Sequence, residues 1–516
     1  MTTVIDDGSR KRHISVGAGT ALAVTLFVGC TLGPEPRRPE TAVDGAESFV
    51  HSAERSESLA GEPDAGVAEG DSRPVTTEWW RRIGDPEIVD LVEQAIAHNT
   101  DLRAAAARVL EADALMRKAG SSRWPEVTAG ASASRVKNSF VLPTVGRVSI
   151  YSTTYSDSLS VSYLVDFLGK LRRTRQSAWA SLLATEAAQQ ALEQAIVAQV
   201  VKSRVTVARL EDSIAVSRQT RESWERTLST VERRYRGGLV AAVDLYLARE
   251  NLSATKAAEA DLAGRLATAK HALDQLVGRR PATGGPMAAT LPELPDPEPL
   301  PLGLPADLLE RRPDLRRAEM QLAAATFGVG VALADLFPAL TLSGSAGTVA
   351  DSLGDLISSD GLVYNAVANL VGPVFNGGLR RAEVAAARAR VEQATAEYAG
   401  IVLTALREVE DALVAEASAR TRLAHTRRRV AEARAADRLA RERYQRGVES
   451  LLKVLETERR LRAAEETLIA TRADLWNARI DLHLALGGDW GLAARTREVS
   501  RTDDSGRGDA PIEVAG

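Results

Sequence analysis

The stretch DLRAAAARVLEADALMRKAGSSRWPEVTAGASAS, residues 101–134, recurs later in the chain as DLRRAEMQLAAATFGVGVALADLFPALTLSGSAG, residues 314–347. Each copy begins with the apolar spacing of a helix and then, after a proline, changes to the alternation of a strand. Two further pairs of segments match in the same order: DFLGKLRR (166–173) with VFNGGLRR (374–381), and ERRYRGGL (232–239) with RERYQRGV (441–448). We therefore predict an internal duplication of one structural unit.

Each unit contains one very long predicted helix. Residues 171–235 contain neither proline nor glycine, and at ~1.5 Å per residue they predict a helix of roughly 100 Å. The spacing of four and then three residues is that of a left-handed coiled-coil seam. The seam positions are Ile196, Val200, Ser203, Val207, Leu210, Ile214, Ser217, Arg221, Trp224, Leu228, Val231 and Tyr235 in the first unit, and Val402, Val409, Leu423, Val430 and Tyr444 in the second. Taken alone, these helices favour a soluble coiled-coil scaffold.

Four segments carry strand signals, two in each unit. They are EVTAGASASR (126–135), SLSVSYLVDF (158–167), ALTLSGSAG (339–347) and LVYNAVANLVGPVF (362–375). A four-stranded sheet in lipid would leave two edges of unpaired N–H and C=O groups, each costing several kcal/mol. Because the smallest transmembrane barrels have about eight strands, at least two chains are needed to close a barrel. Alanine-rich helices packed around the same axis would then continue that barrel as a tube.

The N-terminal segment explains the position of the single cysteine, Cys30. A basic cluster at residues 10–12 precedes the uncharged run Ile14–Gly29, which is too short to span a membrane and is typical of a secretory signal peptide. The residues LFVGC (26–30) resemble a lipobox, in which the cysteine receives diacylglycerol and an N-acyl chain. Cys30 is therefore the predicted lipid attachment site, and Thr31 after it favours export to the outer membrane.

These features give the predicted domain organisation. Residues 35–75 are polar, acidic and nearly free of large apolar groups, as in a flexible tether. The boundaries are 1–29 for the lipoprotein signal peptide, 30–76 for the lipid-anchored tether, 77–278 for the first unit, 279–313 for a proline-rich connector, 314–488 for the second unit and 489–516 for a disordered tail.

Composition and motifs argue against several classes of function. A net charge of −4 and an aromatic fraction of 4% give no indication of a nucleic-acid partner. The six histidines are scattered, and no nucleophile elbow, phosphate loop or metal-binding motif occurs, so we expect no enzyme activity, no metal and no cofactor apart from the lipid on Cys30. After the signal segment no apolar run approaches the length of a membrane helix, so any membrane crossing falls to strands.

The order and spacing of several segments resemble those of TolC-type outer membrane factors, most closely the lipoprotein subgroup (OprM-like, NodT-like) that serves tripartite efflux pumps. These segments lie at residues 30–40, 79–105, 311–347, 372–394 and 443–461. The resemblance implies a homotrimer whose four strands per chain form a twelve-stranded transmembrane β-barrel in the outer membrane, continued by a periplasmic α-helical coiled-coil barrel. It also implies a passive exit duct for substrates delivered by an inner-membrane transporter of the RND type and a periplasmic adaptor protein.

The resemblance further implies a gate where the long helices turn. Asp244 matches an acidic residue that bonds a tyrosine, here Tyr444, and Leu452 matches an apolar constriction. Glu456 matches an acidic ring that favours cations.

Two basic residues near Glu456 complicate that expectation. Arg459 matches a basic residue of the family, and an intrahelical ion pair with Glu456 would compete with contacts between chains. Lys453 departs from the family pattern and places positive charge beside Glu456, which argues against strong cation selectivity. Two other functions stay open at this point: the exit duct of a type I protein-secretion system, and a periplasmic lipoprotein scaffold that forms no barrel.

Overall fold

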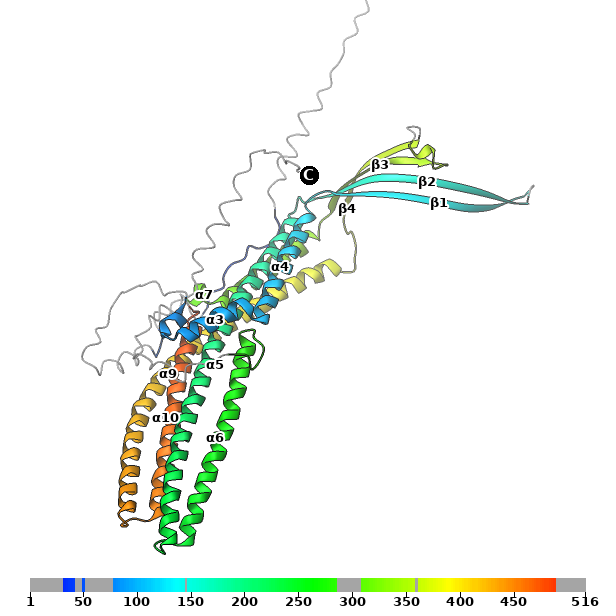
Figure 1. Cartoon of the computed structure of the whole chain (residues 1–516). Coiled ribbons are helices and arrows are strands. Elements are labelled where there is room, and N and C mark those ends of the chain that lie inside the picture. Colours follow the sequence, from blue (N-terminus) through cyan, green and yellow to red (C-terminus); the bar gives the residue numbers. More distant parts are fainter. Residues whose placement is uncertain are drawn as a thin grey trace, which may run out of the picture. The chain divides into compact units, whose positions relative to one another are not determined.

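The computed structural model describes residues 31–41, 49–51, 78–143, 146–284, 308–357 and 361–488. Its elements follow the same order in two halves (Figure 1). The first half contains α4 (Thr100–Ser121), β1 (Glu126–Leu142), β2 (Gly146–Val165), α5 (Lys170–Arg236) and α6 (Ala242–Leu276), and the second contains α8 (Pro313–Ala334), β3 (Ala339–Ala350), β4 (Leu362–Val371), α9 (Leu379–Gln445) and α10 (Leu451–Ala485). Both α5 and α9 have 67 residues, and both α6 and α10 have 35. The predicted duplication is thus confirmed.

Shorter elements complete the described chain: η1 (Trp79–Ile83), α3 (Pro86–His98), α7 (Leu308–Arg311) and η3 (Asp355–Ile357). The chain forms two compact units, which are described separately. Unit 1 comprises residues 1–38, 110–184 and 319–396, and unit 2 comprises residues 39–109, 185–318 and 397–516. Among the described residues, no helix is both long and apolar enough to cross a membrane.

In unit 1 the described strands form an antiparallel sheet with the order β1–β2–β3–β4. Each half of the chain supplies one hairpin. The pairing of β2 with β3, from Tyr155 opposite Ala350 to Val165 opposite Leu340, joins the two hairpins. Figure 1 shows β1 and β2 extending beyond β3 and β4. We call this two-stranded extension, residues 134–142 and 146–154, the outer ribbon.

The pairing register separates two chemically different faces where the sheet has four strands. On one face, Val127 lies opposite Val161 and Ala129 opposite Leu159. The face we call the apolar face carries Val127, Ala129, Ala131, Ala133, Leu159, Val161, Tyr163, Val165, Leu340, Leu342, Tyr364 and Leu370. The other side of β1 and β2 carries mainly serine and threonine, as in Ser132 and Ser156, whose hydroxyl oxygens are 2.9 Å apart.

The strands of the first hairpin are longer than the sequence alone predicts. The expected strands at 126–135 and 158–167 stop where the phase of the alternation changes. In the outer ribbon, the apolar residues Val136, Phe140 and Ile150 lie on the face that carries serine further down the hairpin. A single continuous alternation therefore cannot describe the whole hairpin. The opposite error occurs in β4, which ends at Val371 because Pro373 lacks the N–H that a ladder requires.

The residues that follow the cysteine contact unit 1, so the expected tether is not free along its whole length. The buried Arg173 side chain donates from Nε to the carbonyl oxygen of Leu32 at 3.1 Å and from Nη2 to Oε1 of Glu35 at 2.7 Å. Gly33 has a φ of +101°, and a Cβ there would lie 2.5 Å from the Cα of Gly330. Only glycine combines this backbone angle with such a close approach.

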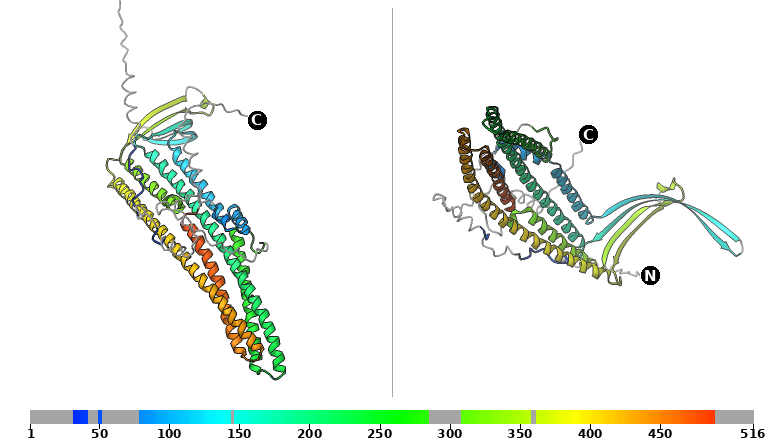
Figure 2. Two further views of the ribbon diagram at one scale, coloured as in Figure 1. Left: turned by 90° about the vertical axis from the view of Figure 1, so that its left-hand side faces the viewer. Right: turned by 90° about the horizontal axis from the view of Figure 1, so that it is seen from below.

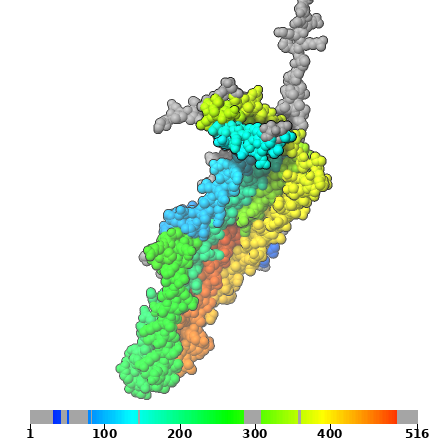
Figure 3. Space-filling view, turned by 90° about the vertical axis from the view of Figure 1, so that its right-hand side faces the viewer, coloured from blue at the N-terminus to red at the C-terminus, as the bar shows by residue number. Residues whose placement is uncertain are grey.

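In unit 2, the described parts of α5, α6, α9 and α10 run side by side (Figures 1 and 2). Figure 3 shows α10, coloured orange to red, between the green α5–α6 pair and α9, coloured yellow to orange. Seam positions of both long helices are buried, which confirms the predicted coiled-coil pattern. They include Ile196, Val200, Val207, Leu210, Ile214, Trp224, Val231, Val402, Val409, Leu423, Val430 and Tyr444. Three other seam positions, Ser203, Arg221 and Leu228, are only half-buried. Tyr235, at the end of α5, is 42% exposed.

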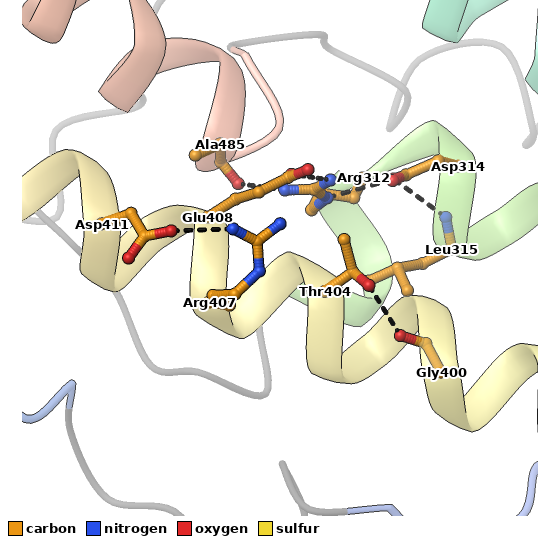
Figure 4. Close-up of polar contacts among 9 residues, drawn as sticks. All are labelled: Arg312, Asp314, Leu315, Gly400, Thr404, Arg407, Glu408, Asp411 and Ala485. Atoms are coloured by element: carbon orange, nitrogen blue, oxygen red, sulfur yellow. Dashed lines mark hydrogen bonds and ion pairs between the residues drawn. The ribbon is translucent and has the colours of Figure 1, made fainter.

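A single arginine ties three helices of unit 2 together (Figure 4). Arg312, between α7 and α8, donates from Nη1 to the carbonyl oxygen of Ala485 at 2.9 Å, in the last turn of α10. Its Nη2 donates to Glu408 of α9 and to Asp314 of α8, each at 2.7 Å. The side chain thereby satisfies one of the carbonyl groups that a helix end leaves without an internal partner.

A second part of the expected tether contacts unit 2. Phe49 is only 3% exposed and packs in a cluster with Leu309 and Tyr398. The backbone N–H groups of Val50 and His51 donate to the two carboxylate oxygens of Glu410 at 2.7 and 3.1 Å. An aromatic anchor and a bidentate carboxylate thus hold this stretch. Cys30, the signal segment and the C-terminal tail lie outside the described residues.

Candidate functional site at the helix hairpin tips

The two turns that connect the long helices are built alike. Gly238 and Gly447 have φ values of +71° and +78°, the left-handed conformation that commonly ends a helix. After Gly238, the N–H of Leu239 donates back to the carbonyl oxygen of Arg234 at 2.9 Å. After Gly447, the N–H of Val448 donates to Arg443 at 3.0 Å. The predicted glycine breaks are therefore the points at which α5 and α9 end.

Apolar residues from all four helices meet just above these turns. The cluster, which we call the tip cluster, comprises Val231, Leu245, Ala248, Ala440, Tyr444, Leu451 and Val454. Figures 1 and 2 show the two turns close together at the same end of the helices. The tip cluster therefore couples the α5–α6 hairpin to the α9–α10 hairpin.

Arg234 of α5 binds the C-terminal end of α9. Its guanidinium carbon lies 4.8 Å from the ring centre of Tyr444. Its Nη1 donates to the carbonyl oxygen of Tyr444 at 3.2 Å and its Nη2 to that of Gln445 at 2.8 Å. A cation favours the negative end of a helix dipole and the face of an aromatic ring. One side chain here makes both interactions with the neighbouring hairpin.

The hydrogen bond expected between Asp244 and Tyr444 is not formed within the described chain. Tyr444 is buried, and its hydroxyl has no hydrogen-bond partner among the described residues. Burial raises the pKa of this hydroxyl, while the charge of Arg234 lowers it and that of Asp244 adds a smaller increase. Asp244 is half-buried in the first turn of α6, near Tyr444 but not bonded to it. The contact that holds the tyrosine ring comes from Arg234.

Sequence reasoning missed Arg234, although a signal was present. The last turn of α5 carries several basic residues, and such residues commonly bind carbonyl groups at a helix end. What the sequence could not indicate is that Arg234 binds the carbonyls of α9 rather than those of its own helix.

The start of α10 carries the other predicted gate residues. Leu452 is 69% exposed, and Lys453 is exposed beside it. The Glu456 carboxylate lies 3.6 Å from Nζ of Lys453 and 2.5 Å from Nη2 of Arg460. Arg460, followed by Lys453, lowers the pKa of Glu456.

The intrahelical pair considered as an alternative for Glu456 and Arg459 is not formed among the described residues, where Glu456 pairs with Arg460 and Lys453. Arg460 replaces Arg459 because a basic residue four positions after a glutamate lies directly over it on the helix surface. Within the described residues Arg459 makes no ion pair and is exposed. The adjacency of Lys453 and Glu456 is confirmed.

A buried acidic network lies between α9 and α10, further from the turn. Arg441 lies 2.7 Å from Oδ2 of Asp437 and 2.8 Å from Oε2 of Glu458. Thr457 is buried with them, and its hydroxyl donates to Asp437 at 3.4 Å. Burial raises the pKa of Glu458 to about 7, against the opposing charge of Arg441. The spacing of Asp437 and Arg441 predicts a helix pair, but nothing in it predicts that Glu458 is buried beside them.

The described residues offer no group of three or more histidine, cysteine or acidic side chains arranged to hold a metal ion. The tip is thus a set of apolar, aromatic and charged side chains at the meeting point of two hairpins. Such an arrangement can exclude water, hold neighbouring helices together and set a local electrostatic potential.

Comparison with known proteins agrees with this architecture. The model of the family described as outer membrane efflux protein matches residues 91–279 and 304–488. The pyoverdine export outer membrane protein OpmQ of Pseudomonas aeruginosa is 34% identical over 430 residues, covering 80% of this chain and 87% of OpmQ. The toluene efflux pump outer membrane protein TtgI of Pseudomonas putida is 30% identical over 477 residues, covering 91% of this chain and 98% of TtgI.

Solved structures show the same fold. The outer-membrane channel OprN superimposes with a TM-score of 0.79 at 31% identity, covering 89% of this chain and 99% of OprN. The Campylobacter jejuni CmeC outer membrane channel superimposes with a TM-score of 0.80 at 22% identity, covering 91% of this chain and 98% of CmeC. The family match, the two relatives and the shared fold show that the chain belongs to the outer membrane efflux protein family.

Proposed function

We propose that three copies of this chain form a gated exit duct in the outer membrane. Members of this family are the outer-membrane components of tripartite efflux systems. In this proposal, a twelve-stranded barrel crosses the membrane and the long helices continue it into the periplasm. Substrates then pass through without chemical change, delivered by a periplasmic adaptor protein and an inner-membrane transporter of the RND type.

The observation that carries this proposal is the open sheet of unit 1. Among the described residues, β1 and β4 have no strand beside their outer edges. Neighbouring strands are antiparallel throughout, so β4 of one copy would also run antiparallel to β1 of the next. Each added copy contributes an even number of strands, and a closed ring leaves no unpaired edge in lipid. The apolar face supplies the side chains that lipid would contact.

We further propose that the tip residues form the gate of the duct. Leu452 is an exposed apolar side chain at the turn, which suits a constriction that dewets. Lys453 and Glu456 lie beside it as an ion pair. Arg459 is exposed and makes no ion pair within the described part of the chain, so in this proposal it meets a neighbouring copy. In this proposal Arg234 contacts Tyr444 and thereby keeps the two hairpins of one copy together in the closed state. The charge of Asp244 lies near the same tyrosine and belongs to the same gate.

Replacing Arg234 with alanine is expected to open this gate. The variant loses the contact with the Tyr444 ring and two hydrogen bonds to α9. We expect a several-fold higher conductance of the purified protein in planar bilayers. Tyr444→Phe is expected to conduct like the wild type, because the hydroxyl that it lacks makes no hydrogen bond among the described residues.

The matched control is Arg218→Ala, on the same helix, where the arginine pairs with Glu259 at 3.2 Å and is 63% exposed. It should leave the conductance unchanged. Equal conductance of Arg234→Ala and Arg218→Ala would show that the contacts of Arg234 with α9 do not keep the gate closed. Failure of the wild type to insert and conduct at all would exclude the duct and favour a scaffold without a barrel.

Lipid attachment at Cys30 is the last part of the proposal. The contacts of Leu32 and Glu35 with Arg173 would hold the modified terminus against unit 1, beside the strands. Cys30→Ser is expected to abolish labelling by radioactive palmitate. An Arg173→Ala control should retain the label, because it changes only the contact and not the acceptor thiol. Equal labelling of wild type and Cys30→Ser would refute attachment at this residue.

A further inference from the structure

One face of the outer ribbon carries basic side chains. Where the sheet has four strands, the apolar face carries Ala131, Ala133 and Leu159. On the same face of the outer ribbon, the register places Arg135, Lys137 and Arg147 instead. The chemistry changes from apolar to basic at the place where β2 stops pairing with β3, at Tyr155. Two independent features, the number of strands and the type of side chain, thus change together.

The position of this change fits the surface of a lipid bilayer. At ~3.3 Å per residue, the strand from Glu126 to Arg135 runs roughly 30 Å, and at the ~40° tilt of membrane barrels it rises about 23 Å. The apolar band of such barrels is about 25 Å tall. Given the proposed function, in which the sheet crosses the outer membrane, Arg135 and Lys137 would therefore lie where acyl chains give way to headgroups.

Among the described residues, no acidic side chain neutralises the charges of these basic residues, so they can bind an external anion. Within the described residues, Arg135, Lys137 and Arg147 form no ion pair and no hydrogen bond through their side chains. The guanidinium of Arg135 and the ammonium of Lys137 lie 5.8 and 5.3 Å from the ring centre of Tyr151. One aromatic ring thus lies within cation–π range of two cations on the same face.

The acidic residue of the hairpin on this face, Asp157, forms no ion pair with the basic residues of the outer ribbon. Asp157 accepts hydrogen bonds from the backbone N–H of Thr348 at 3.1 Å and from the Thr348 hydroxyl. Its carboxylate is therefore engaged by β3. The charges of the outer ribbon remain available for an external anion.

We propose that Arg135 and Lys137 bind the phosphate groups of anionic lipid headgroups at the outer surface of the membrane. Arginine binds phosphate through paired hydrogen bonds and lysine through its point charge. The site lies on the same face as the apolar band, so one lipid can contact both with its acyl chains and its headgroup. It would fix the height of the barrel in the membrane.

The test measures binding of fluorescent lipid A, which carries two phosphates, to the purified full-length protein in neutral detergent. A basic residue near an anionic surface contributes roughly a fivefold gain in affinity. Arg135→Gln/Lys137→Gln is therefore expected to bind about 30-fold more weakly. Arg147→Gln should weaken binding less than about fivefold, because Arg147 lies opposite Val141, six residues further along the ribbon than Arg135. Higher salt should weaken binding by the wild type but have less effect on the double variant.

The matched control is Arg103→Gln/Arg108→Gln, which removes two exposed arginines from α4. It should bind lipid A like the wild type. Equal affinity of the two double variants, or equal wild-type affinity for phosphatidylcholine and lipid A, would overturn the proposal. Far-UV circular dichroism establishes that the variants are folded. The conductance of the wild type is measured in parallel. If the wild type conducts but the variants bind lipid A as it does, the lipid site is refuted while the proposed duct stands.

Discussion

Arg312→Ala is expected to lower the free energy of unfolding by about 2–4 kcal/mol. The wild-type side chain is 7% exposed and binds groups from α8, α9 and α10. Its removal leaves the Ala485 carbonyl without its partner and two carboxylates, Asp314 and Glu408, without their shared cation. Thermal unfolding of the detergent-solubilised protein, followed by circular dichroism, measures the effect.

Figure 4 contains the matched control for this prediction. Arg407 and Asp411 form an ion pair of 2.9 Å on α9, and both side chains are 65% exposed. Arg407→Ala should therefore change the free energy of unfolding by no more than about 0.5 kcal/mol. If the two variants unfolded at the same temperature, Arg312 would not hold the helices together as described.

Glu458→Gln is expected to stabilise the protein at pH 8 and to remove a pH dependence between about 4.5 and 7. Because the folded state raises the pKa of Glu458 to about 7, it binds the proton more tightly than the unfolded chain does. Stability associated with this group is present below pH ~4.5 and is lost as the pH rises to ~7, by about 3 kcal/mol. Glutamine mimics the protonated acid at every pH. Thermal unfolding recorded across this range measures the loss.

Glu466→Gln provides the comparison, since Glu466 pairs with Arg462 on the same helix and is 52% exposed. This variant should follow the wild-type pH profile. A Glu458→Gln profile parallel to that of the wild type would contradict the assignment of the proton to Glu458. Greater stability of the wild type at pH 8 would mean that the ion pair with Arg441 outweighs the cost of burying the charge.

Local patterns in the sequence predict most of the fold. The duplicated segments predict the order of elements, because each unit repeats the same change from helical to alternating spacing. The seven-residue grid through Val402, Val409 and Val430 identifies buried positions, because a helix repeats its faces at a fixed interval. The outer ribbon is missed because Val136 and Phe140 lie on the opposite face from Val127. A phase change is invisible until the register of the partner strand is known.

The candidate site is less accessible from sequence, since its contacts join residues far apart in the chain. The glycine turns follow from local sequence, whereas Leu452 follows only from the family resemblance. Arg234 could not be assigned to Tyr444, because that contact depends on how two hairpins pack. Similarly, the docking of Phe49 depends on a pocket supplied by helices from the second half. Because residues 35–75 are polar overall, the sequence does not indicate that one aromatic residue in them, Phe49, is buried.

The junction between β2 and β3 also constrains how the chain can fold after synthesis. Each hairpin can form from neighbouring residues, but Thr348 meets Asp157 across a separation of 191 residues. Closing so long a loop is slow, and sheets with distant partners fold late. The edge of β2 in the first hairpin therefore stays unpaired until the second half of the chain is available. An unpaired strand edge can pair with another chain, so aggregation competes with folding during that interval.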